Sequence, residues 1–194
     1  KIKGKEYKSR KLSSVIKKLT SNIETLSLES YSFNLLSDDE TNEDNSPLNI
    51  ETLVLISGSF DSYDLKEAIS GCSTLTSFIA QNGTLTEIVT GTFDGCTSLK
   101  EIDIYPDIII GLNALQNIKS LNVLKLRMVQ SIRSSEFDGD VNLTDVSLPM
   151  LTILPNELFA NMNELKIVEL NSTSMLMDGC FKNCTSLENL VLPS

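Results

Sequence analysis

The side chains that most often perform catalysis are sparse in this 194-residue chain. It contains no histidine, so the side chain that most readily exchanges a proton near pH 7 is missing. The sequence also lacks a Gly-x-Ser-x-Gly nucleophile turn, a glycine-rich phosphate loop and a His-Glu-x-x-His zinc motif. Acid pairs such as Glu101 and Asp103 stand two residues apart, which is typical of the exposed face of a strand. We therefore expect a protein that is not an enzyme and uses no cofactor.

Four cysteines raise the alternatives of a metal site, disulfides or buried thiols. Cys180 and Cys184 alone make a poor zinc site, because structural zinc takes four ligands. Cys72, Cys96 and Cys184 occupy one position of a repeated pattern, so all three should point inward as small apolar residues. Cys72 and Cys96 lie on successive repeats and could approach within disulfide distance. We expect free, buried thiols and no metal.

Acidic residues gather in the polar segment 37–47, which we interpret as a solvated loop. Calcium binding is an alternative interpretation of this segment. It lacks the Asp-x-Asp-x-Asp-Gly spacing with a glutamate at position 12 that calcium loops use. The carboxylates concerned are Asp38, Asp39, Glu40, Glu43 and Asp44.

A pattern of Phe-x-x-Cys-x-x-Leu recurs along the chain with a period of 22 residues. Phe93, Cys96 and Leu99 form one copy, and copies that start at Phe159 and Phe181 keep the same register. A fixed period of this size indicates a solenoid, in which stacked repeats share one continuous core.

Each repeat contains a short run of alternating apolar residues, which predicts a strand with one buried face. Eight such strands follow Ile23, Ile50, Leu75, Leu99, Leu121, Leu143, Leu165 and Leu187. A second apolar position comes later in the repeat, at Ile88, Ile110, Ile132, Leu154 and Leu176. After it we expect a short helical or 3₁₀ segment that leads into the next copy.

The segments Phe93-Asp-Gly-Cys96-Thr-Ser-Leu99 and Cys180-Phe181-Lys-Asn-Cys184-Thr-Ser-Leu187 resemble the BspA-like, or Treponema pallidum-type, leucine-rich repeats. The resemblance implies an α/β solenoid, a right-handed array of about eight coils with a parallel sheet on the concave face. Ile118, Asp140 and Met162 depart from the family at the cysteine position. Because a carboxylate is costly to bury without a partner, we expect Asp140 to point outward.

The domain organisation that we predict is a basic N-terminal arm or capping segment, 1–18, followed by one repeat domain, 19–194. Residues 19–64 match the pattern loosely, and the regular repeats run over 65–194. Residues 1–18 hold eight basic groups and one acid, so this segment is either a basic arm for anionic lipid or an acidic partner, or a linker with a capping helix. The chain has a net charge of −10, which argues against nucleic acid as a partner.

Several properties of the whole protein stay open. No apolar run approaches the 18 residues of a membrane span, and no initiator Met or secretory segment is present, so we expect a mature or trimmed fragment. The chain stops just after a strand, so we expect further repeats or another coil to pack there. Glycosylation is undecided at Asn82, Asn142, Asn171 and Asn183, and so is the oligomeric state.

The resemblance implies an interaction module of a cell-surface or secreted protein, of the kind that adheres to host or cell-surface proteins. The alternatives are a structural spacer that carries another domain, and an intracellular scaffold. Strand alternation places a candidate protein-binding surface on the central outward side chains of the sheet, where Tyr and Arg are common hot-spot residues. These candidates are Glu101, Asp103, Tyr105, Val123, Lys125, Arg127, Asp145 and Glu169.

Overall fold

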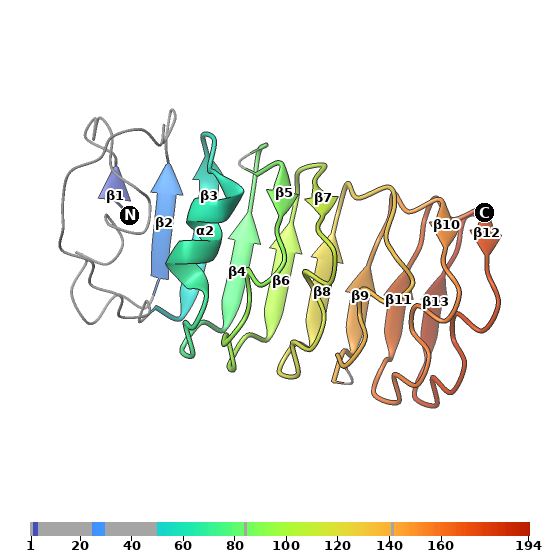
Figure 1. Cartoon of the computed structure of the whole chain (residues 1–194). Coiled ribbons are helices and arrows are strands. Elements are labelled where there is room, and N and C mark those ends of the chain that lie inside the picture. Colours follow the sequence, from blue (N-terminus) through green and yellow to red (C-terminus); the bar gives the residue numbers. More distant parts are fainter. Residues whose placement is uncertain (1, 4–24, 30–49, 84, 141) are drawn as a thin grey trace.

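The protein is a solenoid whose coils stack side by side in one row (Figure 1). The computed structural model describes residues 2–3, 25–29, 50–83, 85–140 and 142–194. Nearly all of the basic segment 1–18 and the whole acidic loop 37–47 lie outside the described residues, so the expectations for the arm, its capping helix and calcium stay untested.

One long parallel sheet runs through the whole array. It has nine strands in the order β1-β2-β3-β4-β6-β8-β9-β11-β13. The bounds are β1 Ile2–Lys3, β2 Thr25–Glu29, β3 Thr52–Ser57, β4 Ser77–Ala80, β6 Glu101–Ile104, β8 Val123–Leu126, β9 Asp145–Ser147, β11 Ile167–Glu169 and β13 Asn189–Val191. All eight strands expected from the alternating pattern are present, and β1, which the sequence did not predict, pairs with β2 at the edge.

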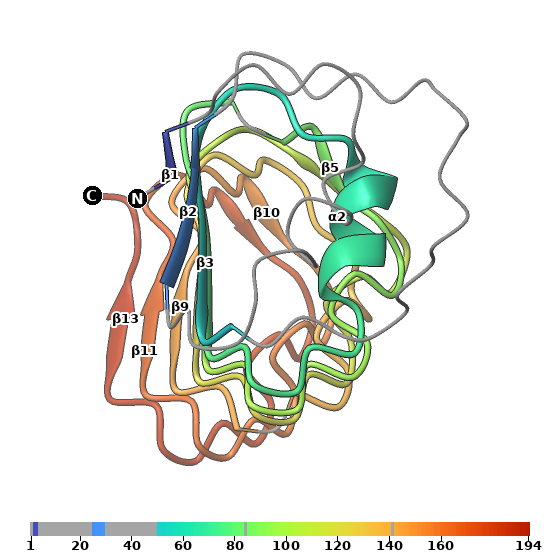
Figure 2. The same ribbon diagram turned by 90° about the vertical axis from the view of Figure 1, so that its left-hand side faces the viewer.

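The register of this sheet follows the repeat. Glu101 pairs with Val123, Val123 with Asp145, and Asp145 with Ile167. Each step is one 22-residue period, so residues that are equivalent in sequence form straight columns across the strands. Figure 2 shows the strands of this sheet edge-on. Their outward side chains form a surface that we call the sheet face.

The opposite wall of the solenoid is built from shorter elements. Helix α2, Ser62–Ile69, begins at Asp61, whose side chain accepts hydrogen bonds from the backbone N–H groups of Tyr63 and Asp64. Two small parallel sheets pair β5 with β7 and β10 with β12. Their bounds are β5 Glu87–Ile88, β7 Ile109–Ile110, β10 Ile153–Leu154 and β12 Met175–Leu176. Four of the five apolar positions predicted late in the repeat therefore lie in strands.

The expected helical or 3₁₀ segment of each coil was wrong for the regular repeats. Outside α2, the described coils return through consecutive tight turns. One turn position, two residues after the aromatic, adopts a positive φ in each regular copy, and it holds Gly95, Asn117, Gly139, Asn161 and Asn183. Gly and Asn tolerate this left-handed conformation best. A left-handed residue interrupts helical geometry, so these turns cannot extend into a helix.

The core is a stack of equivalent apolar side chains between the two walls. Phe137, Phe159 and Phe181 form a column in which successive rings lie 5.7 and 5.5 Å apart, centroid to centroid, and nearly parallel. Phe93 instead meets Phe78 edge-on at 5.4 Å, because Leu115 interrupts the aromatic column. Such ring pairs stabilise the fold by about 0.5–1.5 kcal/mol beyond the area that they bury.

The outward orientation expected for Asp140 was wrong. Its side chain points into the stack and the residue is only 1% exposed. Its Oδ1 accepts a hydrogen bond from the backbone N–H of Ile118 at 2.5 Å, whereas its Oδ2 has no partner. Burial raises the pKa of Asp140 to about 8. The backbone path that the repeat imposes, rather than the local cost of burial, decides where this side chain points.

Candidate functional site

Tyr105, Arg127 and Asp103 form a cluster of contacting polar side chains on the sheet face. Arg127 donates two hydrogen bonds to the Asp103 carboxylate, from Nε to Oδ1 at 2.8 Å and from Nη2 to Oδ2 at 2.9 Å. The same guanidinium lies 4.5 Å from the centre of the Tyr105 ring, a cation–π geometry. The planar Arg fork suits both contacts at once, so the three side chains hold one another in place.

Asp103 is more enclosed than an outward strand residue usually is. It is 7% exposed, because Arg127 covers it. The hydrogen bond to Asp103 is the main cause that raises the pKa of Arg127 above its usual value. A buried carboxylate that loses its only cationic partner is costly. Arg127 therefore stabilises this part of the sheet and is not free to leave Asp103 for a partner.

The other predicted residues surround this cluster without joining it. Lys125 Nζ meets Glu101 Oε1 at 3.1 Å, and the pair is about one-third exposed, so it contributes little to stability. Asp145 accepts a hydrogen bond from its neighbour Thr144 at 2.6 Å, and Glu169 accepts one from Ser147 at 2.8 Å. Neither of these two acids has an ion-pair partner among the described residues. The face therefore presents an excess of negative charge beside Tyr105.

Apolar side chains also reach the sheet face. Val123 is partly buried between Glu101 and Asp145, and Ile167 is exposed at the next step of the same column. A flat face that combines an aromatic ring, an aliphatic side chain and unpaired acids suits contact with a protein surface. Within the described residues, no group of His, Cys, Asp and Glu side chains is arranged to hold a metal ion.

Two buried carboxylates were missed as a pair by sequence reasoning. Glu136 is as deeply buried as Asp140, and its Oε1 accepts a hydrogen bond from the backbone N–H of Leu115 at 3.0 Å. Burial also raises the pKa of Glu136. Each acid therefore accepts a hydrogen bond from a backbone N–H group in a turn of the preceding coil. Their spacing of four residues within one turn was the only available signal, and it is common on exposed surfaces.

The structure has all four cysteines as free thiols, and their redox state stays a prediction. Cys72, Cys96 and Cys180 are buried, whereas Cys184 is only partly so. Cys96 donates to the carbonyl of Ile69 at 3.3 Å, and Cys184 to that of Phe159 at 3.0 Å. Desolvation raises the pKa of Cys96 to about 12. A thiol that stays protonated is a poor nucleophile.

We expect iodoacetamide to modify the folded protein slowly at pH 8 and to add four adducts once the unreduced chain is denatured. Intact-mass measurement distinguishes the two conditions. Two adducts or fewer in the denatured, unreduced sample would establish a disulfide. Fast modification of Cys96 in the folded protein would show that its coil opens.

The repeat agrees with one family model. A model described as the BspA type leucine-rich repeat region matches residues 65–143 and 108–194, in six copies. The chain belongs to this family. Six copies are two fewer than the eight coils expected, and the two additional strands, β2 and β3, precede residue 65. No curated protein matches the sequence.

Solved structures of leucine-rich repeat proteins resemble this BspA-type chain in fold. A leucine-rich cell surface protein from Faecalibacterium prausnitzii A2-165 is 17% identical with a TM-score of 0.50, over 75% of this chain and 52% of that protein. The chain thus corresponds to about half of that protein's length. A leucine-rich repeat protein of T. pallidum is 23% identical with a TM-score of 0.49, over 87% of this chain and 86% of that one.

Proposed function

We propose that this BspA-type chain is a non-enzymatic protein-interaction module of a cell-surface or secreted protein, and that it binds through its sheet face. Solenoids of this kind generally act as extended binding surfaces rather than enclosed catalytic sites. The F. prausnitzii protein of the same fold is a cell surface protein, which supports a surface location here. Adhesion to host or cell-surface proteins is the activity that we propose.

The observation that carries this proposal is the cluster of Tyr105, Arg127 and Asp103. It offers the exposed aromatic ring of Tyr105, against which the Arg127 guanidinium packs. Two hydrogen bonds to Asp103 fix that guanidinium in turn. A pre-ordered anchor loses little conformational entropy on binding. The unpaired acids Asp145 and Glu169 beside it favour a partner with a basic patch.

Replacing Tyr105 with Ala should weaken binding about 5–30-fold, the range for an anchor residue of an interface. The measurement is biolayer interferometry of the purified chain against a panel of extracellular-matrix proteins, together with flow cytometry on whole cells. The association rate should also fall as salt rises, because the face and its partner attract each other electrostatically. Arg127 is a poorer choice for mutation, since its loss would leave Asp103 buried without a cation.

Tyr63→Ala is the matched control, because Tyr63 is an exposed tyrosine on α2, away from the sheet face. It should leave affinity within twofold of the original value. Equal losses for Tyr105→Ala and Tyr63→Ala would remove the sheet face as the binding surface. A chain that binds neither cells nor any protein of the panel would favour the structural spacer, and binding only to intracellular proteins would favour the scaffold.

A further inference from the structure

The small sheets on the wall opposite the sheet face are interrupted at one coil. In β5–β7, Ile109 N donates to Thr86 O at 2.9 Å and Gly111 N to Ile88 O at 2.8 Å. Farther along, Met177 N donates to Leu154 O at 2.9 Å between β10 and β12. The intervening residues 129–133 form no strand. The backbone hydrogen bonds between the short strands of successive coils are therefore interrupted between β7 and β10.

The position of Gly111 holds different residues along the array: Arg133 comes one period later, Pro155 two and Met177 three. A Cβ built on Gly111 would lie 2.8 Å from Ile88 O, so β5 and β7 approach closely here. Met177 has a side chain and still donates to Leu154 O, so a side chain at this position does not by itself prevent pairing. Pro155 has no N–H to donate to the coil before it. Arg133 reaches across instead, and its Nη1 donates to Ile110 O at 2.8 Å.

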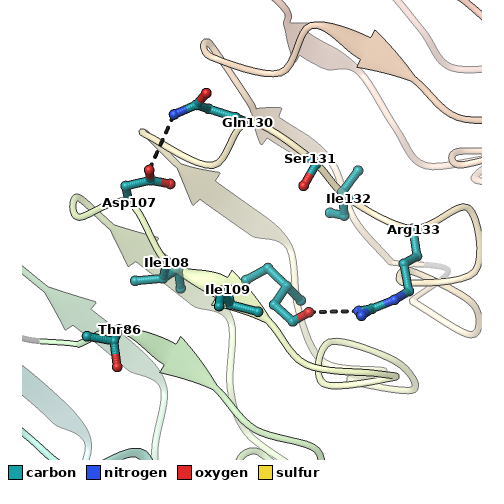
Figure 3. Close-up of a pocket in the computed structure, with 9 residues that line it drawn as sticks. Thr86, Asp107, Ile108, Ile109, Gln130, Ser131, Ile132 and Arg133 are labelled. Atoms are coloured by element: carbon teal, nitrogen blue, oxygen red, sulfur yellow. Dashed lines mark hydrogen bonds between the residues drawn. The ribbon is translucent and has the colours of Figure 1, made fainter.

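The interruption opens a cavity of about 730 Å³ between β7 and residues 130–133 (Figure 3). We call this cavity the window. Two side-chain bridges span it, from Gln130 Nε2 to Asp107 Oδ2 at 3.3 Å and from Arg133 to Ile110 O. The window is open to solvent rather than enclosed. Its apolar lining residues are Ile108, Ile109, Ile110 and Ile132.

The window exposes backbone groups that would pair with each other if residues 130–132 formed a strand beside β7. By the repeat, Ser131 N should donate to Ile108 O, as Ile109 N does to Thr86 O. Neither Ser131 N nor Ile108 O has a hydrogen-bond partner in the part of the chain that the structure describes. One wall therefore offers a backbone acceptor and the other a backbone donor, the two kinds of group with which an extended peptide pairs.

Charge and apolar exposure indicate which peptide fits. The Asp107 carboxylate meets only the neutral amide of Gln130 among the described residues. The other charged residue that lines the window, Arg133, donates to Ile110 O and lies 4.0 Å from Glu136 Oε2, so it already faces an acid of this chain. The chain carries a net charge of −10. Ile109 is 65% exposed. On later coils Ile153 and Met175, which pair in the β10–β12 ladder, extend the same outward apolar column. Large exposed apolar side chains in one column are typical of a contact surface.

We propose that the window is a second docking site, for an extended basic segment of a partner protein. An aliphatic side chain of that segment packs against Ile109 and Ile132. Its backbone pairs with Ile108 O and Ser131 N, and a neighbouring lysine pairs with Asp107. This site lies on the wall opposite the sheet face and does not depend on the function proposed for that face.

The test uses the whole chain, labelled with ¹⁵N, and an acetylated, amidated peptide Lys-Val-Lys-Val-Lys. Titration should shift the backbone amide signals of residues 108–110 and 131–133 and slow hydrogen exchange of the Ser131 amide. The peptide Glu-Val-Glu-Val-Glu should bind at least about tenfold more weakly, because it places acids beside Asp107. Tyr105→Ala, on the other wall, should leave the affinity of the lysine peptide unchanged.

Two exposed positions test the contacts without disturbing the core. Asp107→Asn and Ile109→Ser should each weaken the lysine peptide about 3–10-fold. Glu164→Gln removes the same charge as Asp107→Asn from another exposed position and should change the affinity less than twofold. Equal affinity for both peptides, shifts confined to the sheet face, or unchanged exchange of the Ser131 amide would overturn the proposal and leave a water-filled window only.

Discussion

Replacing Asp140 with Asn should raise the free energy of unfolding by about 2–5 kcal/mol at pH 8–9 and change it little near pH 4. Burial raises the pKa of Asp140 from its ordinary value of 3.8 to about 8 in the folded protein. The folded state therefore binds this proton more tightly than the unfolded state does. The stability that the group contributes is complete below pH 3.8 and is lost as the pH rises towards about 8.

The contacts around Asp140 explain why Asn should replace the protonated acid well. Oδ1 accepts from Ile118 N, while Oδ2 has no partner. In the equivalent position Cys184 donates its thiol hydrogen to the carbonyl of Phe159. The corresponding carbonyl for residue 140 is that of Leu115. A protonated carboxyl or an Asn amide supplies both the acceptor and the donor, whereas a carboxylate supplies only acceptors.

The charges that act on Asp140 raise its pKa further, and the nearby cation faces Glu136 instead. The carboxylates of Glu136 and Asp138 both raise its pKa. Arg133 lies 4.0 Å from Glu136 Oε2 and is the cation of the group, but its guanidinium is half exposed. Deprotonating Asp140 therefore leaves a negative charge in an apolar stack that already holds a second acid.

Urea unfolding followed by circular dichroism, at intervals from pH 4 to pH 9, measures the effect as a difference between two chains. The carboxylates that do not interact with Asp140 titrate alike in both chains, so their contribution cancels. Asp138→Asn is the matched control, because Asp138 is exposed and lies in the same turn. It should shift stability by less than about 0.5 kcal/mol at any pH. If the free energies of unfolding of the original chain and of Asp140→Asn changed in parallel with pH, ionisation of Asp140 would not destabilise the folded protein.

The regular part of the fold was predictable because the repeat fixes the register. With one period of 22 residues, Glu101, Val123, Asp145 and Ile167 had to share a column once they shared a strand position, and the sheet pairs them in that way. No side-chain detail is needed for this inference, since one buried face sets the register of every strand. The same reasoning located the three inward cysteines.

The arrangement of the site was less predictable, because it depends on side-chain rotamers. Alternation placed Asp103, Tyr105 and Arg127 on one face, but the choice of Asp103 as the partner of Arg127 comes from lateral contact between neighbouring strands. Asp140 and the window show a second limit. At both sites a residue that does not suit the repeat occupies a position whose backbone path the repeat fixes. The raised pKa of Asp140 accommodates the first case. In the window, the hydrogen bond between Ser131 N and Ile108 O is missing.

Phe159→Ala should lower the free energy of unfolding by about 3–5 kcal/mol, the range for truncating a buried aromatic residue. Phe159 is 0% exposed and its ring lies between those of Phe137 and Phe181. Alanine would leave a cavity lined by both rings. Because each coil contacts only its neighbours, the loss should weaken the interfaces on both sides of this coil.

Phe181→Ala is the control at the same position of the next coil. Phe181 is only partly buried and stacks on a single ring, that of Phe159, among the described residues. Its loss should therefore cost about 1–2 kcal/mol, since less apolar area leaves water and a smaller cavity remains. Urea midpoints give the two values, and native-state hydrogen exchange of the strands β9 and β11 shows whether the weakened interfaces open first. Equal costs for the two substitutions would mean that the aromatic column does not transmit stability from coil to coil, and that each ring stabilises only its own turn.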